Sequence, residues 1–209
     1  MPRRTRCLEL FKGTGSVGRV CEEMGYDVHS LDIKPKYDPT YCCDILDFDY
    51  KAFKPGYFTI IWASPECKVY SNLQTTNIGR KWRDREHLEQ TRLEHAKYVE
   101  RVLKIIRYLK PKWWFIENPR QSAMKNLKCM QNLPYVDVDY CLFGTLHLKP
   151  TRIWTNRELE DAICERKRHS YQIGMTSAEK MSHAVQGADP TNTEDRYAIP
   201  EALLWYLLS

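Results

Sequence analysis

The chain has 209 residues, of which 43% are hydrophobic and 28% charged, and its formal net charge is +5. This size and composition are typical of one globular domain with a full hydrophobic core. The sequence contains no apolar run long enough to span a membrane, and its basic start lacks the apolar stretch of a signal peptide. We therefore expect a cytoplasmic protein with reduced cysteines, and the absence of any Cys-x-x-Cys pair argues against a metal site.

Strand-like and helix-like segments alternate from the N-terminus. An apolar run at residues 6–11 ends in a glycine-rich turn, and a helix is predicted from 16 to 24, where Gly25 stops it. Further strands are predicted at 27–33, 40–43 and 58–63. The last of these is apolar throughout, which is typical of a strand buried on both faces of a parallel sheet.

The longest periodic segment follows a polar loop. Residues 84–109 carry apolar side chains at helical spacing, and Pro111 ends this predicted helix. A fifth strand is predicted at 112–116. The remaining predicted elements are strands near 135–142 and 152–155 and a short apolar helix that begins at Pro200.

This order predicts an α/β fold with a doubly wound, mostly parallel sheet and ligands at the carboxyl ends of its strands. The short connection between the last two strands predicts an antiparallel edge hairpin. Residues 157–190 lack clear periodicity, so we expect a short irregular insertion there. Residues 1–156 together with 191–209 would then form the main domain.

The first candidate site is the glycine-rich turn after the first strand. Gly13 and Gly15 allow the backbone to approach a ligand, and Ser16 begins a helix whose free N–H groups can face it. Asp32 ends the second strand, where a carboxylate can accept both hydroxyl groups of a ribose, and Asp44 follows the third, where it could accept from an adenine amino group. Either aspartate could instead cap a helix or a turn. A dinucleotide could also use such a turn, but no hydride-transfer signature follows.

The second and third candidate sites follow neighbouring buried strands. Cys67 lies at the end of Ser64-Pro65-Glu66-Cys67, and the polar loop after it favours a cleft over a buried structural cysteine. Glu117 and Asn118 end an apolar strand, where polar groups are costly to bury unless they have a task or form a structural hydrogen-bond network. A thiolate that adds to C6 of cytosine makes C5 nucleophilic, and an acid near N3 stabilises the developing charge. Cys67 and Glu117 are placed to do this together.

These segments together resemble the DNA cytosine-5 methyltransferases, particularly the short forms of phages and other viruses. Residues 9–18 resemble the first cofactor motif of that family, 64–67 its Pro-Cys loop, and 115–119 its Glu-Asn motif. The resemblance implies a seven-stranded sheet of the class I S-adenosylmethionine-dependent methyltransferase type, S-adenosylmethionine as cofactor and DNA as partner. The catalytic residues that it implies are Cys67, Glu117, Asn118 and Arg152. The cofactor-binding residues that it implies are Phe11, Gly13, Gly15, Ser16, Asp32, Ile33, Asp44, Ile45 and Pro65.

Three departures from the family pattern affect these expectations. Glu66 separates Pro65 from Cys67, and its carboxylate should raise the pKa of the Cys67 thiol unless a cation such as Lys68 or Arg152 offsets it. One arginine of the family's arginine pair is missing, and we expect Arg152 to make the remaining contact with the pyrimidine. The insertion at 157–190 is too short for a separate recognition domain, which predicts loose or very short sequence specificity.

Basic residues gather at 80–85 and at 166–169, as a phosphate backbone would favour, although each cluster could simply be solvated surface. We expect a monomer that binds DNA and no membrane, in the cytoplasm or, for a eukaryotic virus, the nucleus. Three alternatives stay open. They are an amino-methyltransferase for cytosine N4 or adenine N6, a cytosine-5 enzyme for tRNA, and a catalytically inactive binder that keeps the cofactor fold.

Overall fold

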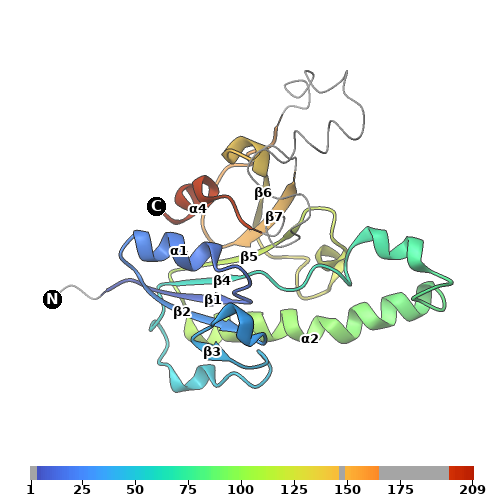
Figure 1. The fold of residues 1–209 in the computed structure, drawn as a ribbon, viewed down its shortest axis with the longest axis horizontal. Helices are drawn as coiled ribbons and strands as arrows, with labels where there is room; N and C mark the ends of the chain where they lie inside the picture. The colour runs from blue at the N-terminus through green and yellow to red at the C-terminus, as the bar shows by residue number, and fades with distance from the viewer. Residues whose placement is uncertain (1–3, 146–148, 165–197) are drawn as a thin grey trace.

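A computed structural model describes residues 4–145, 149–164 and 198–209 of the chain (Figure 1). The strands are β1 (Arg6–Leu10), β2 (Asp27–Asp32), β3 (Tyr41–Cys42), β4 (Ile60–Ala63), β5 (Trp113–Pro119), β6 (Tyr135–Asp139) and β7 (Pro150–Thr155). The helices are α1 (Ser16–Glu23), α2 (Arg85–Leu109) and α4 (Glu201–Leu208). Short 3-10 turns connect them: η1 (Pro35–Tyr37), η2 (Tyr50–Ala52), η3 (Asn72–Asn77), η4 (Ala123–Asn126) and η5 (Tyr140–Phe143).

The strands form one seven-stranded sheet in the order β3-β2-β1-β4-β5-β7-β6. The first five strands are parallel, whereas β7 runs antiparallel to both of its neighbours. The predicted doubly wound sheet with an antiparallel hairpin at one edge is confirmed. The chain crosses from one side of β1 to the other after β3, so a topological switch point lies between β1 and β4, where such sheets bind ligands.

Helices cover both faces of the sheet (Figure 1). Neighbouring residues of β4 show why, because side chains alternate between the two faces of a strand. Ile61 packs in a core with Val102 of α2, whereas Trp62 packs in a second core with Val17 of α1 and Leu203 of α4. All of these side chains are buried. The central strands are therefore apolar on both faces, as predicted from their sequence.

Helix α2 has clear signals at both ends. The Asp84 carboxylate accepts a hydrogen bond from the His87 N–H at 2.7 Å, which caps the first turn. Lys110 adopts a left-handed conformation with φ of 47° directly after the last turn, and Pro111 follows. The helix therefore lies within one residue of its predicted position.

Strand ends differ from the sequence prediction where pairing extends or shortens them. β5 continues to Pro119 because β7 pairs with it through Pro119 and Thr151, so Glu117 and Asn118 belong to the strand itself. β6 ends at Asp139 because the chain turns into η5.

The expected insertion is described only in its first part. Ala162 forms a bridge with Val138 beside β6, so residues up to Cys164 extend along that edge of the sheet. Residues 165–190 lie outside the described residues, and the domain boundary stays a prediction. No helix in the parts of the chain that the structure describes combines the length and apolar character needed to span a bilayer.

Candidate active site

A cavity of about 640 Å³ lies at the carboxyl ends of the central parallel strands. This volume lies in the usual range for small-molecule sites. Eight predicted cofactor residues line it: Phe11, Gly13, Ser16, Asp32, Ile33, Asp44, Ile45 and Pro65. Gly15 lines a second cavity of about 450 Å³. Three of the predicted catalytic residues, Cys67, Glu117 and Asn118, also line the first cavity.

The glycine-rich turn wraps around the end of β1 in a left-handed conformation. Phe11, Gly13 and Gly15 have φ of 61°, 49° and 70°. The Asp32 carboxylate holds this turn, since its two oxygens accept from the N–H groups of Gly13 and Lys34, each at 2.9 Å. Each oxygen keeps a lone pair for a further donor, such as a ribose hydroxyl group. The turn and Asp32 therefore fit an adenosyl ligand.

Glu9 lies beneath the turn and is only 3% exposed. It lines both cavities, and its carboxylate accepts a hydrogen bond from the Gly18 N–H at 3.1 Å. A Cβ at Gly18 would lie 2.9 Å from a carboxylate oxygen of Glu9, so any other residue at this position of α1 would require the Glu9 side chain to shift. Burial raises the pKa of Glu9 to about 7.

The end of β5 fixes the loop that carries Cys67. Asn118 is fully buried, and its amide donates a hydrogen bond at 3.0 Å to the Pro65 carbonyl group. The neighbouring Glu117 carboxylate accepts from the Tyr140 hydroxyl group at 3.4 Å. Hydrogen bonds of two neighbouring residues of β5 therefore hold the backbone before Cys67 and the Glu117 carboxylate that lines the same cavity.

The Cys67 thiol is partly buried, and this burial is the largest cause that raises its pKa. The Glu117 and Glu66 carboxylates raise the pKa further, while the Lys149 ammonium group lowers it. Sequence reasoning did not assign a role to Lys149. The available signal was that Lys149 lies in the region of the family's arginine motif, shortly before Arg152.

Arg152 is not among the described residues that line the cavity. Its guanidinium group donates to both oxygens of the Asp137 carboxylate at 2.8 Å. It also lies over the Tyr135 ring, with 3.6 Å between the guanidinium carbon and the ring centroid. Arg152 thus belongs to a cross-strand pair with Asp137. The predicted contact between Arg152 and a pyrimidine gains no support from this geometry and stays a prediction.

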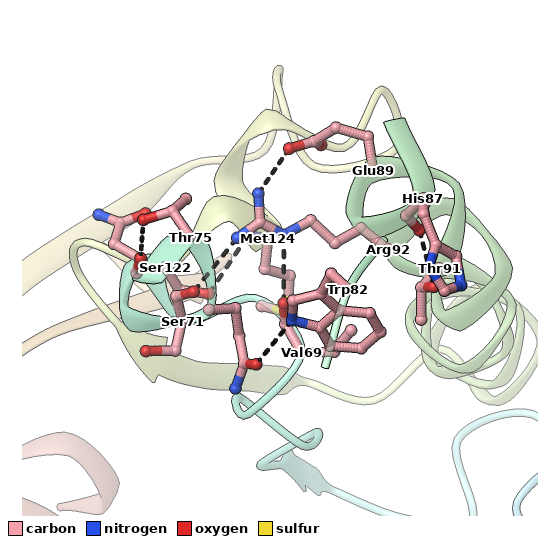
Figure 2. A network of polar contacts seen from close by, with 12 residues as sticks. Val69, Ser71, Thr75, Trp82, His87, Glu89, Thr91, Arg92, Ser122 and Met124 are labelled. Carbon is pink, nitrogen blue, oxygen red and sulfur yellow. Dashed lines mark hydrogen bonds and ion pairs between the residues drawn. The ribbon is translucent and has the colours of Figure 1, made fainter. Parts of the chain in front are cut away.

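The loop after Cys67 is tied to α2 by a buried arginine (Figure 2). Arg92 donates to the carbonyl groups of Val69 and Ser71 at 3.1 and 3.2 Å, and to the Glu89 carboxylate at 2.7 Å. The Tyr70 hydroxyl group donates to the Arg92 carbonyl group at 3.2 Å, and the Tyr70 N–H donates to the Cys67 carbonyl group at 3.1 Å. Sequence reasoning did not single out Arg92, although it lies in the apolar stripe of α2.

The far part of the same loop is basic. Arg80, Lys81, Arg83 and Arg85 are all exposed, and Arg83 pairs with the neighbouring Asp84 at 2.9 Å. The second basic cluster predicted from the sequence, at 166–169, lies outside the described residues. Three side chains of α2, namely His95, Tyr98 and Val99, also line the cavity, and sequence reasoning did not assign a site role to any of them.

The sequence matches no protein-family model. It is similar to a "Probable DNA (cytosine-5)-methyltransferase" of Frog virus 3 (isolate Goorha), with 32% identity over 215 residues, which cover 97% of this chain and 98% of the relative.

Two solved structures have a similar fold. The S. pombe Dnmt2 methyltransferase matches 76% of this chain and 52% of its own, with a TM-score of 0.50 and 16% identity. The Entamoeba histolytica methyltransferase EhMeth matches 78% and 57%, with a TM-score of 0.50 and 16% identity. The chain thus spans just over half the length of these solved structures, and the likeness shows the fold alone.

Proposed function

The chain belongs to the DNA cytosine-5 methyltransferase family, and we propose from this premise that it methylates C5 of cytosine in DNA through a covalent adduct of Cys67. The observation that supports this most directly is that Cys67 and Glu117 line the same cavity as the glycine-rich turn and Asp32. A nucleophile, a carboxyl group and an adenosyl-type site thus share one space, as a transfer between two bound molecules requires.

Enzymes of this family draw the methyl group from S-adenosylmethionine, which supplies an electrophilic methyl carbon when bound. In this chain Asp32 would hold the ribose hydroxyl groups with the lone pairs that its two backbone contacts leave. Asp44 accepts from the Leu46 N–H with one oxygen, so its other oxygen can accept from the adenine amino group. The side chains of Ile33 and Ile45 would pack against the adenine ring.

Cys67 acts on the base in this proposal. Its sulfur donates an electron pair to C6 of cytosine, a C–S bond forms, and the charge that develops at the base is stabilised by Glu117 near N3. C5 then bonds to the methyl carbon as the sulfonium S–CH3 bond of the donor breaks. The C5 proton passes to solvent, and the bond between Cys67 and C6 breaks to restore the thiolate. Asn118 keeps the loop in place by its hydrogen bond to the Pro65 carbonyl group.

DNA would reach the cavity with one base turned out of its stack, because C6 cannot be reached inside a duplex. The exposed basic side chains at 80–85 lie on the same loop as Cys67 and can contact phosphate groups on either side of that base. The loop between Cys67 and α2 would thus both cover the base and bind the DNA backbone.

The test is mass spectrometry of nucleosides from treated DNA and tRNA. We expect 5-methylcytosine in DNA, none with Cys67→Ser, and a rate about 10²–10³ lower with Glu117→Gln. Cys42→Ser is the matched control, because Cys42 is exposed on β3. Methylated N4 of cytosine or N6 of adenine, or full activity in Cys67→Ser, would contradict the mechanism. Product only in tRNA would keep the chemistry and change the substrate.

A further inference from the structure

Cys67 lies among carboxylates, although its proposed reaction needs a thiolate. Glu66 precedes it in the chain and Glu117 faces the same cavity. Nearby negative charge disfavours the ionised thiol, and so does burial. A cation close to Cys67 would offset this, and the sequence offered Lys68 and Arg152 for that task.

In the structure each of these two cations pairs with a carboxylate. The Arg152 guanidinium group is bound to both oxygens of Asp137 at 2.8 Å, on the outer strands. The Lys68 ammonium group lies 4.0 Å from the Glu66 carboxylate, and both side chains are more than half exposed. Such an exposed pair is weak and screened by solvent. It neutralises part of the Glu66 charge and leaves that of Glu117.

Lys149 approaches the same cavity from the start of β7. It lines the cavity together with Cys67 and Glu117. Its ammonium group lies 4.7 Å from the centroid of the Tyr140 ring, and the hydroxyl group of that buried ring donates to Glu117 at 3.4 Å. Tyr140 therefore holds a cation on its face and the carboxylate at its hydroxyl group, which keeps both charges at the cavity that Cys67 lines.

We propose that Lys149 is the residue that stabilises the Cys67 thiolate in this chain. The thiol S–H bond breaks, the proton passes to solvent, and the sulfur keeps the electron pair beside the ammonium group. The direction of the Lys149 effect on the pKa of Cys67 agrees with this arrangement. Other titratable groups that line the cavity include Glu66, Lys68, Tyr70, His95, Tyr98 and Glu117. The contribution to turnover rests on the proposed function, but the effect on the thiol does not.

The experiment measures the rate at which iodoacetamide alkylates Cys67 between pH 6 and 10, read from the Cys67 peptide by mass spectrometry. An opposite charge at short range changes a pKa by one unit or more, so Lys149→Met and Lys149→Gln should each react about tenfold more slowly at pH 7.5. Lys149→Arg keeps the charge and should follow the parent curve. Lys68→Met is the comparison for a cation on the loop itself, with an expected change below about twofold.

A parent-like alkylation curve in folded Lys149→Met or Lys149→Gln overturns the proposal, and so does a larger effect of Lys68→Met. A shifted curve in Lys149→Arg also overturns it, because the charge would then not be the cause. The melting temperature of each variant shows that it is folded. Alkylation needs neither cofactor nor DNA, so a chain that never yields 5-methylcytosine would refute the proposed function and leave this measurement valid. A matching shift in the pH profile of kcat, rescued by arginine, would extend the effect to turnover.

Discussion

At the scale of single residues, the Glu9 carboxyl group links stability to pH. Burial raises its pKa from 4.5 to about 7, although the N–H groups of Gly18 and Val17 oppose this. Between these two values the unfolded chain ionises Glu9 while the folded chain keeps the proton. The stability therefore falls as pH rises from about 4.5 to about 7, and it stays lower above that range.

Glu9→Gln should remove this penalty. At 1.36 kcal/mol per pKa unit the variant should gain roughly 3 kcal/mol in the free energy of unfolding at pH 8, and less than about 1 kcal/mol at pH 5. Urea unfolding at the two pH values measures the difference. Glu22→Gln on the exposed face of α1 is the control and should change little at either pH. An equal effect of Glu9→Gln at both pH values would show that Glu9 is already ionised in the fold.

Residue positions in the candidate site were predictable where they follow from strand order. Cys67 and Glu117 were expected together because they end or follow neighbouring strands, and the structure brings both to one cavity. The position of Arg152 was not predictable in this way. It pairs with Asp137 because the two residues are partners in the register of β6 and β7, and register depends on tertiary pairing.

At the scale of elements, the contact between α2 and the loop after Cys67 depends on Arg92. Its side chain occupies the buried stripe of the helix between Leu88 and Ala96 and supplies donors to two loop carbonyl groups. A buried carbonyl group that loses its donor costs about 1–3 kcal/mol. At this position of the stripe the helix makes a polar contact where an apolar one would be usual, and this polar contact specifies where the loop lies.

Arg92→Met should therefore lower the free energy of unfolding by roughly 2–4 kcal/mol and loosen the loop. Hydrogen exchange of the amides at 69–82 should accelerate in the folded protein, whereas exchange in the central strands should follow only the global change. Lys97→Met is the matched control, since it removes an exposed cation from the same helix. Unchanged exchange at 69–82 would mean that other contacts hold the loop.

Element boundaries show what the sequence could and could not predict. The position of α2 was predicted within one residue because Asp84 and Pro111 mark its ends locally. The extension of β5 through Pro119 depends on β7, which lies more than thirty residues later in the chain. The apolar run predicted this strand only as far as residue 116, where Glu117 and Asn118 follow, and the ladder with β7 extends the strand through both.

At the scale of the whole molecule, alternating strands and helices were sufficient to predict the sheet and the edge at which the site lies. The same reasoning leaves sequence specificity and the expected monomeric state as predictions. The described part of the expected insertion extends along β6 up to Cys164, so this edge of the sheet is covered by the chain itself. The proposed function requires above all that the cavity bring a cytosine base to Cys67.

Covalent trapping tests that claim most directly. The normal reaction removes a proton from C5, and a fluorine atom cannot be removed in this way. Duplex DNA that contains 5-fluorocytosine should therefore stop the reaction while the bond between Cys67 and C6 is intact. Incubated with S-adenosylmethionine, the parent chain and Cys42→Ser should each give an adduct that survives a denaturing gel and maps to the Cys67 peptide, and Cys67→Ser should give none. An adduct at another cysteine, or 5-methylcytosine formed on ordinary DNA without any adduct on the fluorinated DNA, would contradict it.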